Sequence, residues 1–242
     1  MRVDPPNVVR TMKICVVANS NEDDVGLLDG TLSGLGKYVL AAREDPSEWR
    51  DVDGVDLFLH LGSSWSVYWD SVRSRVDAEA SLMRHSIERG VPVFGICFGA
   101  QMLSHACGGV VERGKKTEIG WYDVVAPESN SVLTGRWMQW HYDSFTAPRG
   151  FDVLAINEAG VQAIRRGRSF GVQFHPEANE PIVSKWMSGE GAAELAAAGI
   201  APSSLLDETR RGVERTSVAT TKLMDWFLED VAQGPVAPSP SN

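Results

Sequence analysis

Short apolar runs alternate with segments of helical periodicity over the first 110 residues of the chain. Runs of consecutive apolar residues bounded by turn-forming residues are typical of strands that are buried on both faces of a parallel sheet. Between two such runs, Val76, Ala80, Met83 and Ile87 recur at helical spacing, and Gly90 is a natural end for that helix. The pattern predicts strands at 14–18, 38–42, 56–61 and 91–94, and helices at 25–35, 76–87 and 100–106.

The pattern changes after residue 110. Short β-type runs follow one another up to residue 170, which indicates an antiparallel section attached to the parallel sheet, and beyond residue 177 the periodicity is helical. We therefore predict an α/β fold, with a mostly parallel central sheet, helices on both faces, a small antiparallel section and a helical C-terminal extension. The expected strands lie at 120–125, 137–141, 153–157 and 162–165, and the expected helices at 192–198, 203–214 and 218–231.

Length and charge limit the classes of partner. The 242 residues suit a single domain over 1–232, followed by a Pro- and Ser-rich tail at 233–242 that we expect to be disordered. A net charge of −9 argues against nucleic acid, which needs clustered Lys and Arg. No apolar stretch approaches the ~20 residues of a membrane span, and the N-terminus lacks the apolar core of a signal peptide. These features predict a cytoplasmic protein with no membrane or nucleic-acid partner.

The most informative motif is Gly95-Ile96-Cys97-Phe98-Gly99, which follows a short apolar run and precedes a helical segment. A strand, a sharp turn at Gly-x-Cys-x-Gly and a helix are the parts of a nucleophile elbow with cysteine in place of serine. The helix N-terminus favours a thiolate at Cys97. The other two cysteines, Cys15 and Cys107, have irregular spacing and apolar surroundings, so we expect core residues, with no disulfide framework and no metal site.

A second motif, Gly171-Val172-Gln173-Phe174-His175-Pro176-Glu177, places a candidate base and its carboxylate partner after another strand-like run. Cys97 would attack a carbonyl carbon, His175 would handle the proton, and Glu177 would hold the imidazole in one tautomer. The backbone N–H groups of Phe98 and of the turn at Gly62 would stabilise the oxyanion. Since ligands gather at the carboxyl ends of parallel strands, these groups are expected to meet there. We expect His60, His85 and His105 to be structural or exposed.

Both motifs, in this order, resemble those of the class I (triad) glutamine amidotransferases, which release ammonia from glutamine through a cysteine thioester. The resemblance extends from about residue 13 to 231 and is greatest to the free-standing GMP synthase-like amidotransferases, with a flavodoxin-like fold. It implies that Cys97, His175 and Glu177 are the triad and that Gly62 and Phe98 are the oxyanion donors. It also implies substrate contacts, which involve Gln101, Trp140, His141, Tyr142 and Asp143.

These substrate contacts have structural alternatives. Gln101 also fits an ordinary helix position, and His141 and Asp143 also fit structural roles. Trp121 belongs to a further segment that resembles the family, Glu118-Ile119-Gly120-Trp121, and fits packing better than binding. Two departures from the family pattern affect the pocket. Ser63-Ser64-Trp65 follows Gly62 where many relatives have a Gly- and Pro-rich loop, and Tyr142 replaces a glycine.

The function expected from these residues is hydrolysis of the γ-amide of glutamine or of a γ-glutamyl compound, without a cofactor. The sequence has no Gly-rich phosphate loop, so ammonia would pass to a synthetase or acceptor subunit, or to none. A γ-glutamyl peptidase or γ-glutamyl-amine hydrolase is the alternative among enzymes, and a non-catalytic regulatory or binding subunit is the alternative outside them. The sequence leaves open a homodimer.

Overall fold

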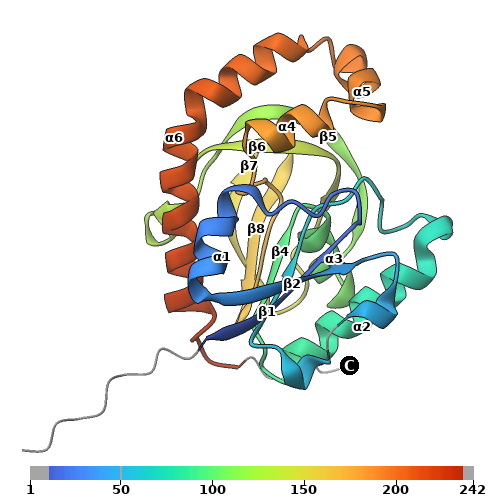
Figure 1. Ribbon diagram of the computed structural model, residues 1–242, viewed down its shortest axis with the longest axis vertical. Coiled ribbons are helices and arrows are strands. Elements are labelled where there is room, and N and C mark those ends of the chain that lie inside the picture. The colour runs from blue at the N-terminus through green and yellow to red at the C-terminus, as the bar shows by residue number, and fades with distance from the viewer. Residues whose placement is uncertain (1–10, 50, 237–242) are drawn as a thin grey trace, which may run out of the picture.

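A seven-stranded sheet forms the centre of the computed structural model, which describes residues 11–49 and 51–236 (Figure 1). The strand order is β2-β1-β3-β4-β9-β8-β7, and a separate two-stranded sheet pairs β5 with β6. The seven strands are β1 (Met12–Ala18), β2 (Gly36–Ala42), β3 (Leu57–His60), β4 (Val93–Ile96), β7 (Asp152–Asn157), β8 (Gly160–Arg166) and β9 (Ser169–Val172), and the pair is β5 (Val111–Val124) and β6 (Gly135–Phe145).

Five neighbouring strands of the large sheet, from β2 to β9, run parallel, and β8 and β7 continue the sheet in antiparallel register. Strands β3, β4 and β9 are buried along their whole length, as expected for runs covered on both faces. The predicted mostly parallel sheet with an antiparallel section is confirmed.

Helices cover both faces of the sheet. One core joins Leu28 and Leu32 to Leu223 and Phe227, and a second core packs Val76 and its helical neighbours on the other face. In Figure 1, α1 and α6 lie on one side of the sheet and α2 on the other. The α-helices are α1 (Asp29–Leu35), α2 (Arg73–Glu88), α3 (Phe98–Ala106), α4 (Glu180–Trp186), α5 (Glu190–Ala198) and α6 (Pro202–Trp226). Short 3-10 helices lie at Gly26–Leu28, Pro46–Glu48, Val52–Gly54, Asp70–Val72 and Glu128–Leu133, and a π-helix at Phe227–Val231.

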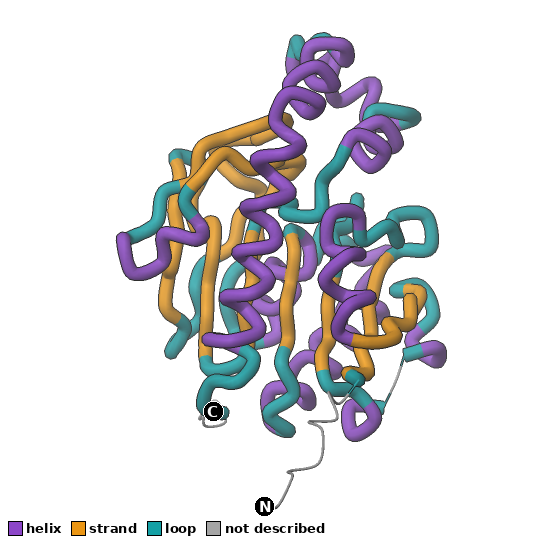
Figure 2. The backbone as a smooth tube through the Cα atoms, turned by 60° about the vertical axis from the view of Figure 1, so that its left-hand side comes forward, coloured by secondary structure: helices purple, strands orange, loops and turns teal. Residues whose placement is uncertain are grey.

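Two predictions about elements need correction. The segments expected as separate helices at 203–214 and 218–231 are continuous, because α6 runs from Pro202 to Trp226 and the π-helix Phe227–Val231 follows it directly. The first turns of α6 extend beyond the strands (Figure 2). Thr216 lies within this helix, where it is buried and its hydroxyl donates to the carbonyl of Gly212. The strands expected at 120–125 and 137–141 are longer, and they pair with each other outside the main sheet.

The sequence predicted no signal peptide at the N-terminus and a disordered tail at 233–242. Residues 1–10 and 237–242 lie outside the described residues, while 233–236 lie inside them, with Arg168 donating to the carbonyl of Gly234. None of the helices described is both long and apolar enough to cross a lipid bilayer.

Candidate active site

The carboxyl ends of three adjacent parallel strands bring the motif residues together. Gly62 follows β3, Cys97 follows β4, and His175 follows β9, and these strands are neighbours in the order β3-β4-β9. A Cβ atom built on Gly62 would lie 2.9 Å from Cε1 of His175 and 3.6 Å from Cβ of Cys97. Side chains 78 residues apart in sequence therefore meet at Gly62, as the placement at strand ends predicted.

Cys97 sits at a sharp turn between β4 and α3. Its φ of 51° and ψ of −107° make it the one non-glycine residue with positive φ in the described part of the chain. The flanking glycines are required sterically, since a Cβ on Gly95 would lie 2.4 Å from the carbonyl oxygen of Gly99. A Cβ on Gly99 would lie 2.1 Å from the carbonyl oxygen of His60. This is the geometry of a nucleophile elbow, with strain concentrated at the residue that bears the thiol.

Two backbone amides next to the thiol are available as donors. Phe98 is the first residue of α3, so its N–H has no intrahelical acceptor. Within the described ranges, neither this N–H nor that of Gly62 donates to a protein acceptor. The thiol itself accepts from Nε2 of Gln173 at 3.5 Å and lies 3.8 Å from the carbonyl oxygen of Trp140.

His175 and Glu177 form a buried pair, with 2.6 Å between Nδ1 and Oε1. Burial on its own lowers the pKa of the imidazole, but the carboxylate of Glu177 and the sulfur of Cys97 together raise that pKa well above its usual range. Nε2 of His175 has no hydrogen-bond partner among the described residues, so this nitrogen is available to a reacting group. Glu177 and Cys97 thus both favour the charged form of the imidazole, against the effect of burial.

Four elements hold this pair from behind. The N–H of His175 donates to the carbonyl of Met138 at 2.8 Å, the N–H of Leu27 donates to the carbonyl of Glu177 at 3.0 Å, and the hydroxyl of Thr220 donates to the carbonyl of Pro176 at 2.7 Å. The ring of Trp186, from α4, packs against the imidazole with 4.6 Å between ring centroids. The pair is thus fixed by β6, the segment before α1, α6 and α4.

The residues that the resemblance implied as substrate contacts line the same cavity. Gln101 is buried, and its amide nitrogen lies 3.3 Å from Oε1 of Gln173. His141 is held by Glu118 at 3.2 Å and by the carbonyl of Asp143 at 2.9 Å, which fits the structural alternative. The guanidinium of Arg113 stacks on the ring of Tyr142. Trp140 and Tyr142 also face the cavity, on β6.

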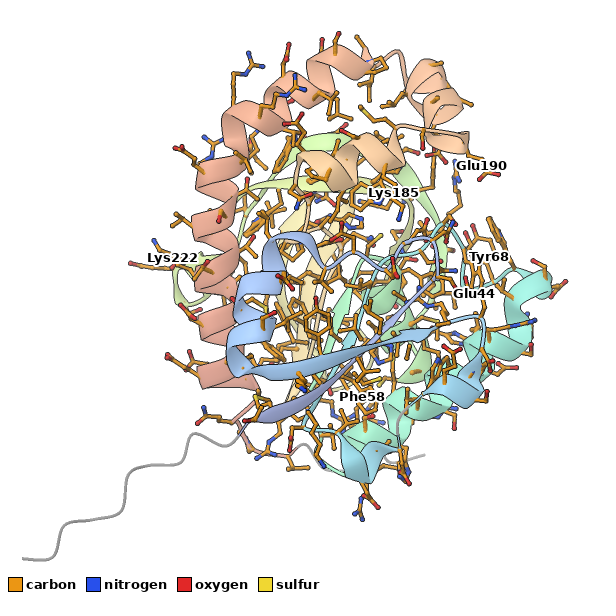
Figure 3. The ribbon with its side chains drawn as sticks, in the orientation of Figure 1. Glu44, Phe58, Tyr68, Lys185, Glu190 and Lys222 are labelled. Atoms are coloured by element: carbon orange, nitrogen blue, oxygen red, sulfur yellow. The ribbon has the colours of Figure 1, made fainter. Side chains whose placement is uncertain are left out.

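The cavity has a volume of about 890 Å³. Its floor carries Cys97 and His175, and the loop Ser63-Ser64-Trp65 forms part of its wall, as expected from the sequence. Residues from α4 and α5 also line the cavity. In Figure 3, Glu190 of α5 and Tyr68, which donates to Asp143, lie on one side of the molecule, Lys185 of α4 lies nearer the middle, and Lys222 lies on the other side.

Candidate residues outside this cavity have other surroundings. Cys15 is buried in the core, and burial raises the pKa of the Cys107 thiol to about 11, so that thiol is a weak nucleophile at neutral pH. His60 is buried against Glu79, with 2.8 Å between Nδ1 and Oε1. Across residues 11–49 and 51–236, no group of three or more His, Cys, Asp or Glu side chains is arranged to hold a metal ion.

Sequence reasoning missed several residues of the site. Trp186 packs on His175, and Glu194 accepts from the indole of Trp140 at 2.6 Å. Glu22 lines the cavity and accepts from the N–H of Ser64, and burial raises the pKa of its carboxyl. The separation of 42 to 54 residues within these hydrogen-bonded pairs leaves no local pattern to read.

Comparison with known proteins agrees with this geometry. Residues 71–181, which include Cys97, His175 and Glu177, match the family model "Glutamine amidotransferase class-I". A glutamine-hydrolysing GMP synthase of Rippkaea orientalis is 40% identical over 149 residues, which are 57% of this chain and 26% of that protein. Another from Aeropyrum pernix is 32% identical over 173 residues, which are 66% of this chain and 32% of that protein. The chain thus spans less than a third of the length of these relatives.

Solved structures show the same fold. A glutamine amidotransferase of Thermotoga maritima superposes with a TM-score of 0.82 at 24% identity, over 91% of this chain and 100% of that one. One from Methylobacillus flagellatus gives a TM-score of 0.75 at 20% identity, over 93% and 96% of the two chains. The fold is that of class I glutamine amidotransferases, and residues 71–181 carry the sequence of that class, which confirms the resemblance found in the motifs.

Proposed function

We propose that this protein hydrolyses the γ-amide of glutamine, or of a γ-glutamyl compound, through a thioester on Cys97. The observation that carries the proposal is the strained Cys97 beside a buried His175–Glu177 pair and two unpaired backbone amides. The relatives that match 57 and 66% of this chain are named as glutamine-hydrolysing enzymes, which supports the same chemistry.

In the first half-reaction the Cys97 thiolate attacks the γ-carbonyl carbon and forms a C–S bond. The negative charge on the carbonyl oxygen is stabilised by the N–H groups of Gly62 and Phe98. The C–N bond then breaks as Nε2 of His175 gives its proton to the leaving nitrogen, so ammonia or an amine departs. The raised pKa of His175 favours the protonated imidazole, which is the form that this step requires.

In the second half-reaction a water molecule attacks the thioester while Nε2 of His175 accepts its proton. The C–S bond breaks, glutamate leaves, and the thiolate and the protonated imidazole are restored. Glu177 holds Nδ1 of His175 throughout, so that Nε2 faces the reacting atoms. On the substrate side, we propose that Gln101 and the backbone of Trp140 to Tyr142 hold the glutamyl group.

The size of the cavity favours a second candidate, a γ-glutamyl-amine hydrolase or γ-glutamyl peptidase. Pockets for drug-sized ligands span ~300–1,000 Å³, and this cavity of about 890 Å³ lies near the top of that range, although glutamine is a small amino acid. Its lining carries Glu22, Asp24, Glu190 and Glu194 against the cations Arg113 and Lys185. A larger leaving group with a positive charge would fit this cavity, because these carboxylates would attract it.

The purified protein should be incubated with glutamine and with a panel of γ-glutamyl amines while free glutamate and ammonia or amine are measured. We expect glutamate from at least one of them, and a loss of about 10⁴-fold or more in Cys97→Ala. Cys15→Ala is the matched control and should keep the activity. A wild-type protein that releases no glutamate from any of these compounds would contradict the proposal.

Turnover of glutamine that is weak alone and rises with an added synthetase would indicate an ammonia-accepting partner. Strong turnover of one γ-glutamyl amine without a partner would instead indicate a stand-alone hydrolase. A chain that binds glutamine without turnover would be the non-catalytic alternative.

A further inference from the structure

A buried arginine lies directly behind the proposed oxyanion site. Arg43 follows the last residue of β2, and its side chain is completely buried, as is that of Glu79 on α2. Nε of Arg43 donates to Glu79 at 2.8 Å, and His60 lies 2.8 Å from the other oxygen of the same carboxylate. The reaction outlined above gives neither Arg43 nor Glu79 a role.

The guanidinium of Arg43 also donates to the backbone of the turn after β3. Nη2 donates to the carbonyl oxygen of Leu61 at 2.8 Å, and Nη1 donates to that of Gly62 at 3.0 Å. Nη1 also donates to the side chain of Asn19 at 2.6 Å. The planar fork with its five N–H groups can hold all of these acceptors at once, whereas a lysine ammonium cannot.

The carbonyl of Leu61 and the N–H of Gly62 belong to one peptide unit. This unit is planar and trans, so its C=O and N–H point in opposite directions. Arg43 holds the C=O on one side, and the N–H therefore faces the other side, away from the arginine. A positively charged donor on the carbonyl also polarises the amide and strengthens its N–H as a hydrogen-bond donor.

The same guanidinium contacts the second proposed donor. Its central carbon lies 4.8 Å from the centre of the Phe98 ring, a cation–π contact. Phe98 provides the other amide beside Cys97, so one side chain contacts both residues that are proposed to donate to the oxyanion. Glu79 balances the charge, and its pKa, which burial would raise, is held at about 2 by Arg43 and His60.

We propose that Arg43, held by Glu79, is a positioning residue that orients and polarises the Gly62 amide of the oxyanion site and fixes Phe98 against it. The inference rests on the proposed function, since it concerns the same carbonyl. Arg43 does not touch the substrate, and its effect is transmitted through the peptide between Leu61 and Gly62.

The test compares a reaction that forms an oxyanion with one that does not. In Arg43→Lys we expect kcat for the γ-glutamyl substrate to fall about 10²-fold, as for a lost oxyanion donor, with little change in KM. Alkylation of Cys97 by iodoacetamide, followed by peptide mass spectrometry, forms no oxyanion and should keep its rate. Arg168→Lys is the matched control, because Arg168 also donates to two backbone carbonyls, those of Gly90 and Gly234, and it should keep kcat.

A second variant, Arg43→Met/Glu79→Met, removes both buried charges together, which is often tolerated where loss of one partner is not. It should show the same loss of kcat with retained alkylation. An unchanged kcat in either folded variant, or equal losses of kcat and alkylation rate, would overturn the proposal. If the wild type itself turns over no γ-glutamyl compound while Cys97 is alkylated, the proposed function fails and this inference falls with it.

Discussion

At the residue scale, the site depends on one strained position and one buried pair. Cys97 takes a conformation with positive φ that residues with side chains rarely adopt, and Gly95 and Gly99 leave room for it. The buried pair of His175 and Glu177 lies beside it. Because the two side chains are in close contact, Glu177 affects the pKa of His175, and this effect can be measured.

Replacing the two members of the pair should have unequal effects. His175→Ala removes the proton carrier, so we expect glutamate release to fall about 10⁴-fold or more. Glu177→Gln leaves the imidazole in place but poorly held, so the loss should be roughly ten- to a hundredfold smaller, with hydrolysis of the thioester impaired more than its formation. Rapid-quench kinetics separate the two steps, and small, equal effects of both substitutions would show that the pair is structural.

The imidazole of His175 should titrate above its ordinary midpoint. Burial opposes its positive charge, but Glu177 and Cys97 favour it more strongly, so His175 keeps its proton as the pH rises past ~6.5. NMR titration of the ring Cε1–H measures the midpoint directly. In Glu177→Gln that midpoint should fall, because burial remains while the carboxylate charge is gone. A wild-type midpoint at or below ~6.5 would contradict this assignment.

At the element scale, the chemistry could be predicted more fully than the packing. The strand–elbow–helix around Cys97 follows from Gly95 and Gly99, since a side chain at either would collide with backbone. The continuity of α6 was missed because Thr216 and Ser217 are weak helix formers. Packing decides the outcome there, with Thr216 buried and bonded to Gly212 within the helix.

Gly212 offers a test of that helix. It lies inside α6, and a Cβ built on it would meet only Arg215 at 3.6 Å and Thr216 at 3.9 Å, which is ordinary contact. Gly212→Ala should therefore raise the free energy of unfolding by about 0.5–1 kcal/mol, because glycine is a poor residue within a helix.

The matched control for this substitution is Gly99→Ala, in α3. Its Cβ would lie 2.1 Å from the carbonyl oxygen of His60, so this variant should be destabilised. Urea unfolding measures both variants. A destabilised Gly212→Ala protein would mean that α6 is interrupted there.

At the scale of the whole molecule, the site is assembled from distant segments. The strand order β3-β4-β9 brings Gly62, Cys97 and His175 together. The motifs around Cys97 and His175 predicted this arrangement from the sequence. No sequence motif predicted the network of Arg43, Glu79 and His60, because Arg43 follows β2, Glu79 lies on α2 and His60 lies on β3. Charged residues are also ordinarily expected at the surface. These side chains become buried only when β2, β3 and α2 pack together.

This network should make the fold sensitive to acid. The folded pKa of Glu79 is about 2, below its ordinary value of 4.5, so the stabilisation is present above pH 4.5 and is lost as the pH falls toward 2. Urea unfolding over this pH range should show a steeper loss in the wild type than in Arg43→Met/Glu79→Met. Parallel curves for the two proteins would show that Glu79 does not titrate with folding.

The central claim is that Cys97 carries the γ-glutamyl group during the reaction. The most direct measurement is an acid quench of the protein during turnover of the best γ-glutamyl substrate, followed by peptide mass spectrometry. We predict a mass increase of one γ-glutamyl group on the peptide that contains Cys97, absent from Cys97→Ala and sensitive to hydroxylamine, as a thioester is. Turnover with no adduct on this peptide, or an adduct on Cys15 or Cys107 instead, would contradict the account.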